Sequence, residues 1–430
     1  MITERALLAR YFHRLGFGPR PGEFQNALRI GASAYLEHSL NLPVTEPNNF
    51  PIFEKLGSRP SNNIKRVEWN LKMREQRTNL VYWWLDQMAS STNQFQEKVV
   101  WFWHGHWATS LAKVDFANAM LMQQKKFRIY GLANFNTIAE QMIFDGALQF
   151  WLDNNSNTVK APNENLAREL MELFTLGVNR YTEDDIKAAS KALTGYSLDR
   201  ESGAVTFNVK RHDSSIKTIL GRSENFDGTS LVRHLVSQEN CGQFIAERLW
   251  FRFINDASNP PDNLISNAFS GRECKAAFAA TAKHPGFSDE KNSMVKPPLE
   301  WFIASCRALS ILPSKLAANF ARKEALLVQL DNLAQKPFYP PNVGGWPAGE
   351  IWLTASGAQY RLELAQQLVK YGEISVISKT NVNQRIGALA DLLGVGEWSA
   401  RTKNALEDAK NDPARLIVIA LCTPENLVSV

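Results

Sequence analysis

The stretch from residue 162 to residue 197, PNENLARELMELFTLGVNRYTEDDIKAASKALTGYS, constrains the fold more than any other part of this sequence. It predicts two short helices joined by a tight turn. Pro162 favours a helix start, and Gly177 accepts the left-handed backbone conformation that ends many helices. Thr182 and Asp185 have the spacing of a capping box at the start of the second helix. We therefore expect a tightly connected helix pair.

The first of these helices has one apolar face and one polar face. The polar face carries three carboxylates, a guanidinium and an amide: Glu164, Asn165, Arg168, Glu169 and Glu172. Such a face is most often solvated and crossed by ion pairs between residues four apart. The alternative is a catalytic face. In it, Glu169 acts as a metal ligand or general base, and Arg168 binds an anionic group of the substrate with both arms.

A second motif, WHGHW at residues 103–107, contains two histidines. Imidazole is the commonest metal ligand near neutral pH. The motif lies in a helical pattern, where His104 and His106 point about 200° apart. Both could bind one ion only where Gly105 ends or distorts the helix. The alternative is a pair of packed histidines, each hydrogen-bonded to the backbone.

A third motif, Arg211-His212-Asp213, follows a predicted β-hairpin. Asp213 can orient the imidazole of His212 or supply a ligand oxygen of its own. The alternative is a turn in which Asp213 caps the segment that follows. If this loop meets the other two motifs, the result is a mixed histidine and carboxylate set of the kind that binds Zn, Mn or Fe.

The rest of the chain predicts a mainly α fold, with one large multi-helix domain and a small β-hairpin insertion. We expect residues 1–310 to form the main helical domain, including the hairpin near 196–220. We expect residues 311–430 to contribute a proline- and glycine-rich loop, FYPPNVGGWPAG, and C-terminal helices that pack on that domain. This loop cannot form a regular element. We interpret it as a structural wrap in which Trp346 and Trp352 fill the core.

Composition limits the classes of function. The net charge is only +5 over 430 residues with no long basic run, so we expect no nucleic-acid partner. The four cysteines are far apart and lack metal or disulfide spacing, which is typical of buried small hydrophobes. No apolar run approaches the roughly 20 residues of a membrane span. The N-terminus lacks the apolar core of a signal peptide, so we expect a cytoplasmic location by default, or export if a leader was removed.

Long motifs along the chain resemble one known family. They are FHRLGFGPRPGEF, WFWHGHWAT, the central helix pair, RHDSSIKTILG, KPPLEWFIASCRALS and PFYPPNVGGWPAGEIWL. The chain is similar over nearly its whole length to the bacterial family catalogued as domain of unknown function 1800. The resemblance implies no established activity, although members of the family often look exported. Function must therefore be inferred from the residues themselves.

Two functional hypotheses follow. The first is a hydrolase with a His/carboxylate centre that needs a divalent metal, with these residues: metal ligands His104, His106 and His212, and catalytic Glu169, Arg168 and Asp213. The second is a non-catalytic scaffold or binding protein in which the same residues form a buried polar network that fixes the helix packing. The motifs of serine hydrolases, P-loop enzymes, dinucleotide-binding proteins and HExxH metalloproteases are missing. The sequence specifies no substrate, metal or oligomeric state.

Overall fold

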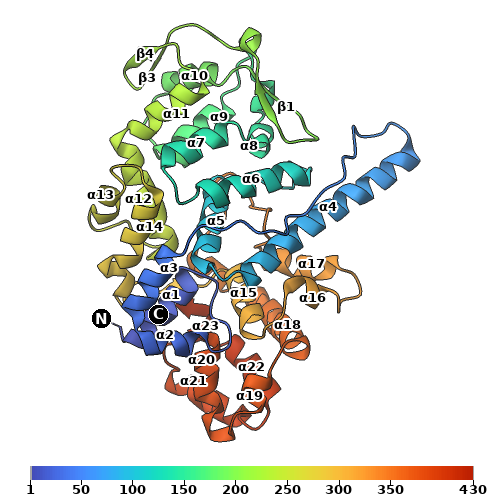
Figure 1. Ribbon diagram of the computed structural model, residues 1–430, viewed down its shortest axis with the longest axis vertical. Helices are drawn as coiled ribbons and strands as arrows, with labels where there is room; N and C mark the ends of the chain where they lie inside the picture. The colour runs from blue at the N-terminus through green and yellow to red at the C-terminus, as the bar shows by residue number, and fades with distance from the viewer. Residues whose placement is uncertain (1, 430) are drawn as a thin grey trace.

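A computed structural model describes residues 2–429 of the chain, and it is an elongated assembly of helices (Figure 1). Within these residues there are 23 α-helices and three small two-stranded antiparallel sheets. The predicted mainly α fold is therefore confirmed. Among the same residues, no helix combines the length and the apolar character needed to cross a membrane.

The N-terminal part is a group of helices around a long hairpin of α4 and α5. Thr3 caps the first helix through its side chain, as expected for an N-cap residue. The bounds are α1 (Glu4–Arg14), α2 (Glu23–Ile30), α3 (Ala32–Asn41), α4 (Asn63–Ser90) and α5 (Gln94–His106). The N-terminal half of α4 projects sideways from the body of the protein (Figure 1).

The central part contains the predicted helix pair. Thr182 and Asp185 form the expected capping box, and Gly177 has the expected positive φ of 94°. The first helix differs from expectation, because after a short α9 it widens into a π-helix over Leu170–Thr175. The bounds are α6 (Ala117–Tyr130), α7 (Phe135–Ile143), α8 (Gly146–Trp151), α9 (Asn165–Glu169) and α10 (Glu183–Ala192).

The region predicted as one β-hairpin contains two. In the first, β1 (Tyr196–Leu198) pairs with β2 (Val205–Phe207), with Tyr196 opposite Phe207. In the second, β3 (Lys217–Ile219) pairs with β4 (Arg222–Glu224). Both lie at the end of the molecule that is distant from the C-terminal helices (Figure 1).

The remaining chain returns along the molecule, forms the helices at its other end and comes back to end nearer the middle (Figure 1). It comprises α11 (Gly228–Ser237), α12 (Glu239–Phe253), α13 (Leu264–Ala268), α14 (Cys274–Lys283), α15 (Pro298–Ala308), α16 (Pro313–Ala317), α17 (Glu324–Asn332), α18 (Ala355–Tyr371), α19 (Ser375–Ser378), α20 (Arg385–Leu393), α21 (Ala400–Ala409), α22 (Pro413–Leu421) and α23 (Pro424–Leu427). The last strand, β6 (Val428–Ser429), pairs with β5 (Met294–Val295). This pairing joins the end of the chain to the middle of the fold. The predicted division between residues 310 and 311 stays a prediction.

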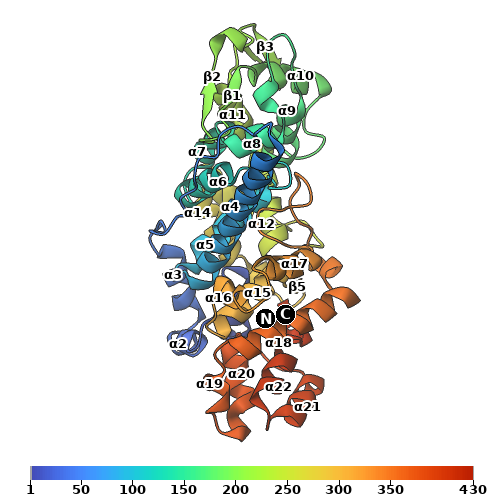
Figure 2. The ribbon, with the colours of Figure 1, turned by 90° about the vertical axis from the view of Figure 1, so that its right-hand side faces the viewer.

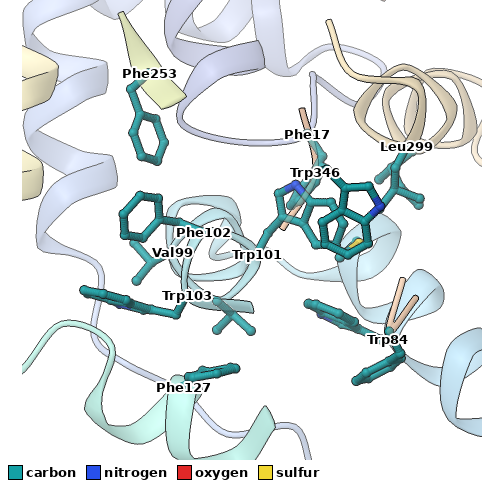
Figure 3. Packing of buried hydrophobic residues seen from close by; sticks show 14 of the residues in the cluster. Phe17, Trp84, Val99, Trp101, Phe102, Trp103, Phe127, Phe253, Leu299 and Trp346 are labelled. Atoms are coloured by element: carbon teal, nitrogen blue, oxygen red, sulfur yellow. The ribbon is translucent and has the colours of Figure 1, made fainter. Parts of the chain in front are cut away.

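Tryptophans and phenylalanines dominate the core around α4 and α5 (Figure 3). The ring centroids of Trp84 and Trp101 lie 5.5 Å apart, and Trp101 lies 4.7 Å from Trp346 of the proline- and glycine-rich loop. Such tilted aromatic pairs stabilise a core beyond the effect of buried area alone. Trp346 and Trp352 are both buried, as the structural-wrap interpretation requires.

Candidate functional site

The imidazole of His104 is completely buried in the aromatic core. It lies edge-on to Trp84, with ring centroids 5.0 Å apart, and next to Trp346. Its Nε2 accepts a hydrogen bond of 3.2 Å from the backbone N–H of Phe338, so the proton of the neutral ring belongs on Nδ1. Burial lowers the pKa of His104 to about 3, which keeps the ring neutral at physiological pH.

The imidazole of His106 is also buried, but it faces a different set of partners. Its Nε2 donates to the carbonyl oxygen of Phe174 in the π-helix, at 3.0 Å. The ring is stacked near Phe102. Burial, together with the nearby Arg248, lowers the pKa of His106 to about 3. The two histidines of the motif therefore act as separate packing groups with opposite hydrogen-bonding roles.

His212 and Asp213 lie at the hairpin end of the molecule. Nδ1 of His212 is 3.1 Å from the carbonyl oxygen of Thr194, and the Thr194 hydroxyl accepts from the backbone N–H of Asp213 at 2.8 Å. The Asp213 carboxylate accepts from the backbone N–H of Ser215 at 2.8 Å. Asp213 thus caps the following turn, which is the alternative that the sequence left open.

The polar face of the central helix is held by ion pairs. Arg168 forms a two-armed pair with Glu183, at 2.8 and 2.7 Å, and a longer contact of 3.4 Å with Glu164. The hydroxyl of Tyr181 donates to the carboxylate of Glu172. Glu169 is half-buried, and its burial and the neighbouring Glu172 raise its pKa. Arg168 is thus already occupied by carboxylates of its own chain.

The structure does not gather the six predicted site residues at one point. His104 and His106 have separate partners inside the aromatic core, while His212 and Asp213 bind the backbone beside α10. Throughout residues 2–429, no three His, Cys, Asp or Glu side chains are grouped so that they could hold a metal ion. The metal centre stays a prediction, and elemental analysis is its test.

A different cluster of charged residues meets where α1, α5, α12 and α15 come together, and sequence reasoning missed it. The ammonium of Lys98 in α5 lies 2.6 Å from the carboxylate of Glu300 in α15 and donates to the carbonyl oxygen of His13 in α1, at 3.1 Å. Lys296, just before α15, donates to the side-chain oxygen of Asn426 at 3.2 Å. Lys98, Glu300 and Lys296 are all buried.

Lys296 and Glu300 of this cluster line a small cavity of about 30 Å³, which we call the cationic cavity. Its charged lining is His13, Arg14, Arg252, Lys296 and Glu300. All three side-chain nitrogens of Arg14 have partners, since Nη1 and Nη2 donate to carbonyl oxygens of Ile254, Asn292 and Ser429 and Nε donates to the hydroxyl of Ser429. Arg252 is different, because its Nη1 is buried and has no hydrogen-bond partner among the described residues. A buried, unpaired N–H of a guanidinium is costly unless a water or an anion satisfies it.

Burial perturbs the protonation of this cluster. It lowers the pKa of Lys296 to about 7, against the opposing effect of Glu300. It also lowers the pKa of Lys98, again against Glu300. Burial and the positive charge of Lys296 lower the pKa of His13 well below its ordinary value. Perturbed groups of this kind, gathered at a cavity, are typical of functional sites.

Comparison with known proteins gives one match. The family model described as "Protein of unknown function (DUF1800)" matches residues 10–428. The chain belongs to this family. No curated protein and no solved structure matches the chain significantly. The family membership predicted from the motifs is confirmed, and it assigns no activity.

Three of the motifs that resemble the family line the cationic cavity, and a fourth lies beside Arg252. HRLGFG supplies His13 and Arg14, and KPPLEW supplies Lys296 and Glu300. The proline- and glycine-rich loop lines the cavity with Ala348. The WHGHW motif contributes Gly105, where an added Cβ atom would lie 3.4 Å from Nη2 of Arg252. One feature of the sequence indicates this buried charged cluster. Single charged residues stand inside apolar helical runs, as with Lys98 in EKVVW and Glu300 in PLEWF.

Proposed function

We propose that this protein is a binding protein for a small oxyanion, of the size of a carboxylate group, and that the ligand occupies the cationic cavity. The observation that carries the proposal is Arg252, which lines this cavity and whose buried Nη1 has no hydrogen-bond partner in the described chain. Guanidinium groups recognise carboxylates and phosphates with short, charge-assisted hydrogen bonds.

The balance of charge favours an anion. Arg14, Arg252 and Lys296 line the cavity, and Asp256, outside the lining, offsets part of the charge of the two arginines. Glu300 is the single carboxylate in the lining. That carboxylate is already bound to Lys98 at 2.6 Å. Buried charges are stable when they are paired, and uncompensated ones cost several kcal/mol each. An anion in the cavity would supply the missing charge and accept from Arg252.

The size of the cavity restricts the ligand. A volume of about 30 Å³ holds about two water-sized groups. It therefore fits the head of a small anion rather than a whole nucleotide or sugar. In this proposal the histidines of WHGHW have a structural role, because their hydrogen bonds fix α5 against Phe338 and Phe174.

The experiment is a thermal-unfolding titration at constant ionic strength. Formate, acetate, phosphate and sulfate are compared with chloride. A ligand that binds only the folded state raises the Tm in a saturable way. We expect one of these oxyanions to do so, and Arg252→Gln to weaken its apparent affinity at least tenfold. The control is Arg233→Gln, a surface residue paired with Glu140.

The proposal fails if no oxyanion raises the Tm more than chloride does. It also fails if Arg252→Gln, like the control Arg233→Gln, responds to the oxyanion as the wild type does. Arg252→Lys covers the case in which Arg252→Gln does not fold, because it keeps the charge and loses the planar donor pair. Its titration should show weaker binding with an unchanged fold.

The metal-dependent hydrolase is the second candidate. The observation in its favour is Glu169, a half-buried carboxyl of raised pKa at the start of a π-helix, since π-helical turns are frequent at functional sites. A stoichiometric transition metal in protein purified without an affinity tag would favour it. Hydrolytic activity lost in Glu169→Gln, with an unchanged Tm, would support it further.

A further inference from the structure

The projecting N-terminal half of α4 carries an apolar row that no other part of the described chain covers. Ile64, Val67 and Leu71 are 82%, 59% and 61% exposed. They are three and four residues apart, so they share one side of the helix. The tip of the helix stands away from the body of the protein in Figure 1 and points toward the viewer in Figure 2.

The other side of the same helix is already occupied. The indole N–H of Trp69 donates to the carbonyl oxygen of Gly57 at 3.2 Å, and the amide of Gln76 donates to that of Glu54 at 2.8 Å. Met73, on the same side of the helix as Trp69 and Gln76, is buried. The loop therefore contacts this side of the projecting half of α4, which we call the arm, and the row Ile64, Val67 and Leu71 faces outward.

Positive charge is concentrated at the same place. Residues 51–77 contain seven Lys or Arg residues and three Glu residues, which gives +4 of the chain's net charge of +5. Glu54 and Glu68 both lie near Lys72, at 3.3 and 3.8 Å, so two of the three carboxylates are partly neutralised. The basic residues are interspersed, so no run of charge marks this feature in the sequence.

We propose that this arm docks on an anionic lipid surface, with Ile64, Val67 and Leu71 entering the headgroup region. Exposed apolar residues interleaved with Lys and Arg on a helix are the combination that binds anionic bilayers. The positive charge complements lipid phosphates, and the apolar row gains free energy only where it leaves water. A nucleic acid would engage the charges and leave the apolar row in water. The inference is independent of the anion proposed for the cationic cavity.

The experiment is co-sedimentation of the full chain with vesicles of phosphatidylcholine alone and with vesicles containing about 30% phosphatidylglycerol. We expect binding to the anionic vesicles only, weakening as salt is raised. The triple variant Ile64→Ser, Val67→Ser, Leu71→Ser should bind at least tenfold more weakly, and so should Lys65→Glu with Arg66→Glu. All five side chains are at least partly exposed, so the variants should fold.

The matched control is Ile30→Ser, Val178→Ser, Leu264→Ser, which removes three similarly exposed apolar residues elsewhere. It should bind like the wild type. The proposal is overturned if anionic vesicles do not bind the wild type, or if the control loses as much binding as the α4 variants. It is also overturned if the α4 variants lose only nucleic-acid binding, or only self-association in sedimentation velocity, since the arm would then serve that partner instead.

Discussion

The backbone of Gly345 lies directly against the carbonyl oxygen of Gly105, at a distance that leaves no room for a side chain. A Cβ atom on Gly345 would come within 2.4 Å of that oxygen, and its φ is +84°. The contact joins the proline- and glycine-rich loop, which lines the cationic cavity through Ala348, to the end of α5. It explains why a glycine stands at position 345.

Gly345→Ala should lower the free energy of unfolding by about 2 kcal/mol or more. The substitution combines a strained φ with a clash against backbone that cannot move aside freely. Urea denaturation followed by circular dichroism measures the change. The control is Gly387→Ala within α20, where a Cβ atom meets nothing within 4 Å. That variant should gain about 0.5–1 kcal/mol, because alanine is the better helix former. Equal stability of the two variants would contradict the proposed role of the contact.

Glu97→Ala should be strongly destabilising. Glu97 and Arg128 are both buried and form a two-armed ion pair at 2.5 and 2.9 Å between α5 and α6. Removing one partner of a buried pair leaves an uncompensated charge, which typically costs about 3–5 kcal/mol. Chemical denaturation of the variant provides the measurement.

An exposed ion pair provides the comparison for Glu97. Glu68 contacts Lys72 at 3.8 Å on the surface of α4. Glu68→Ala should change stability by less than about 1 kcal/mol, since such pairs contribute little. A loss at Glu97 no greater than the loss at Glu68 would show that water reaches Arg128.

Local features of the fold were predictable from sequence because they depend on neighbouring residues. The cap at Thr3 and the capping box of Thr182 and Asp185 involve residues at most three apart. At the start of α5, Ser91 and Asn93 are both suitable N-cap residues, and the side chain of Asn93 is the one that accepts from the first turn. Two nearby candidates of similar capping strength cannot be separated by spacing alone.

The π-helix and the cationic cavity were not predictable, since both depend on contacts between distant segments. The His106 ring binds a carbonyl oxygen of the π-helix 68 residues away, and Lys98 meets Glu300 across more than two hundred residues. A buried lysine cannot be told from a surface lysine until its partner is known. The six predicted site residues were chosen by chemical type, and their separation in space had no signature in the sequence.

His106→Phe should reduce stability without changing any response to metal. The carbonyl oxygen of Phe174 loses its donor at 3.0 Å, and an unsatisfied buried acceptor costs about 1–3 kcal/mol. Chelators should leave the Tm of the wild type unchanged. The control is His38→Phe, since His38 is exposed on α3. A chelator-dependent drop in Tm that disappears in His106→Phe would instead support the predicted metal centre.

Lys296→Met should alter how stability depends on pH. Burial lowers the pKa of Lys296 to about 7, whereas the unfolded chain has an ordinary lysine with a pKa near 10.4. Between these values the unfolded state binds the extra proton, so the wild type gains stability as the pH rises from 7 towards 10. Lys296→Met removes that contribution, and its stability should rise less over the same interval. Urea denaturation at pH 7 and pH 9 gives both slopes.

Lys296 is surrounded by charged groups, so the control is a lysine without such surroundings. The charged groups come from four helices and are His13, Arg14, Lys98, Arg252 and Glu300. Lys403→Met removes an exposed lysine on α21 and should keep the slope of the wild type. If Lys296 is also a contact of the bound oxyanion, the stabilisation of the wild type by that anion should weaken as the pH rises through 7, because the ammonium loses its charge. An anion effect that is constant from pH 6 to pH 9, or a slope in Lys296→Met equal to that of the wild type, would show that Lys296 keeps its proton and takes no part in this balance.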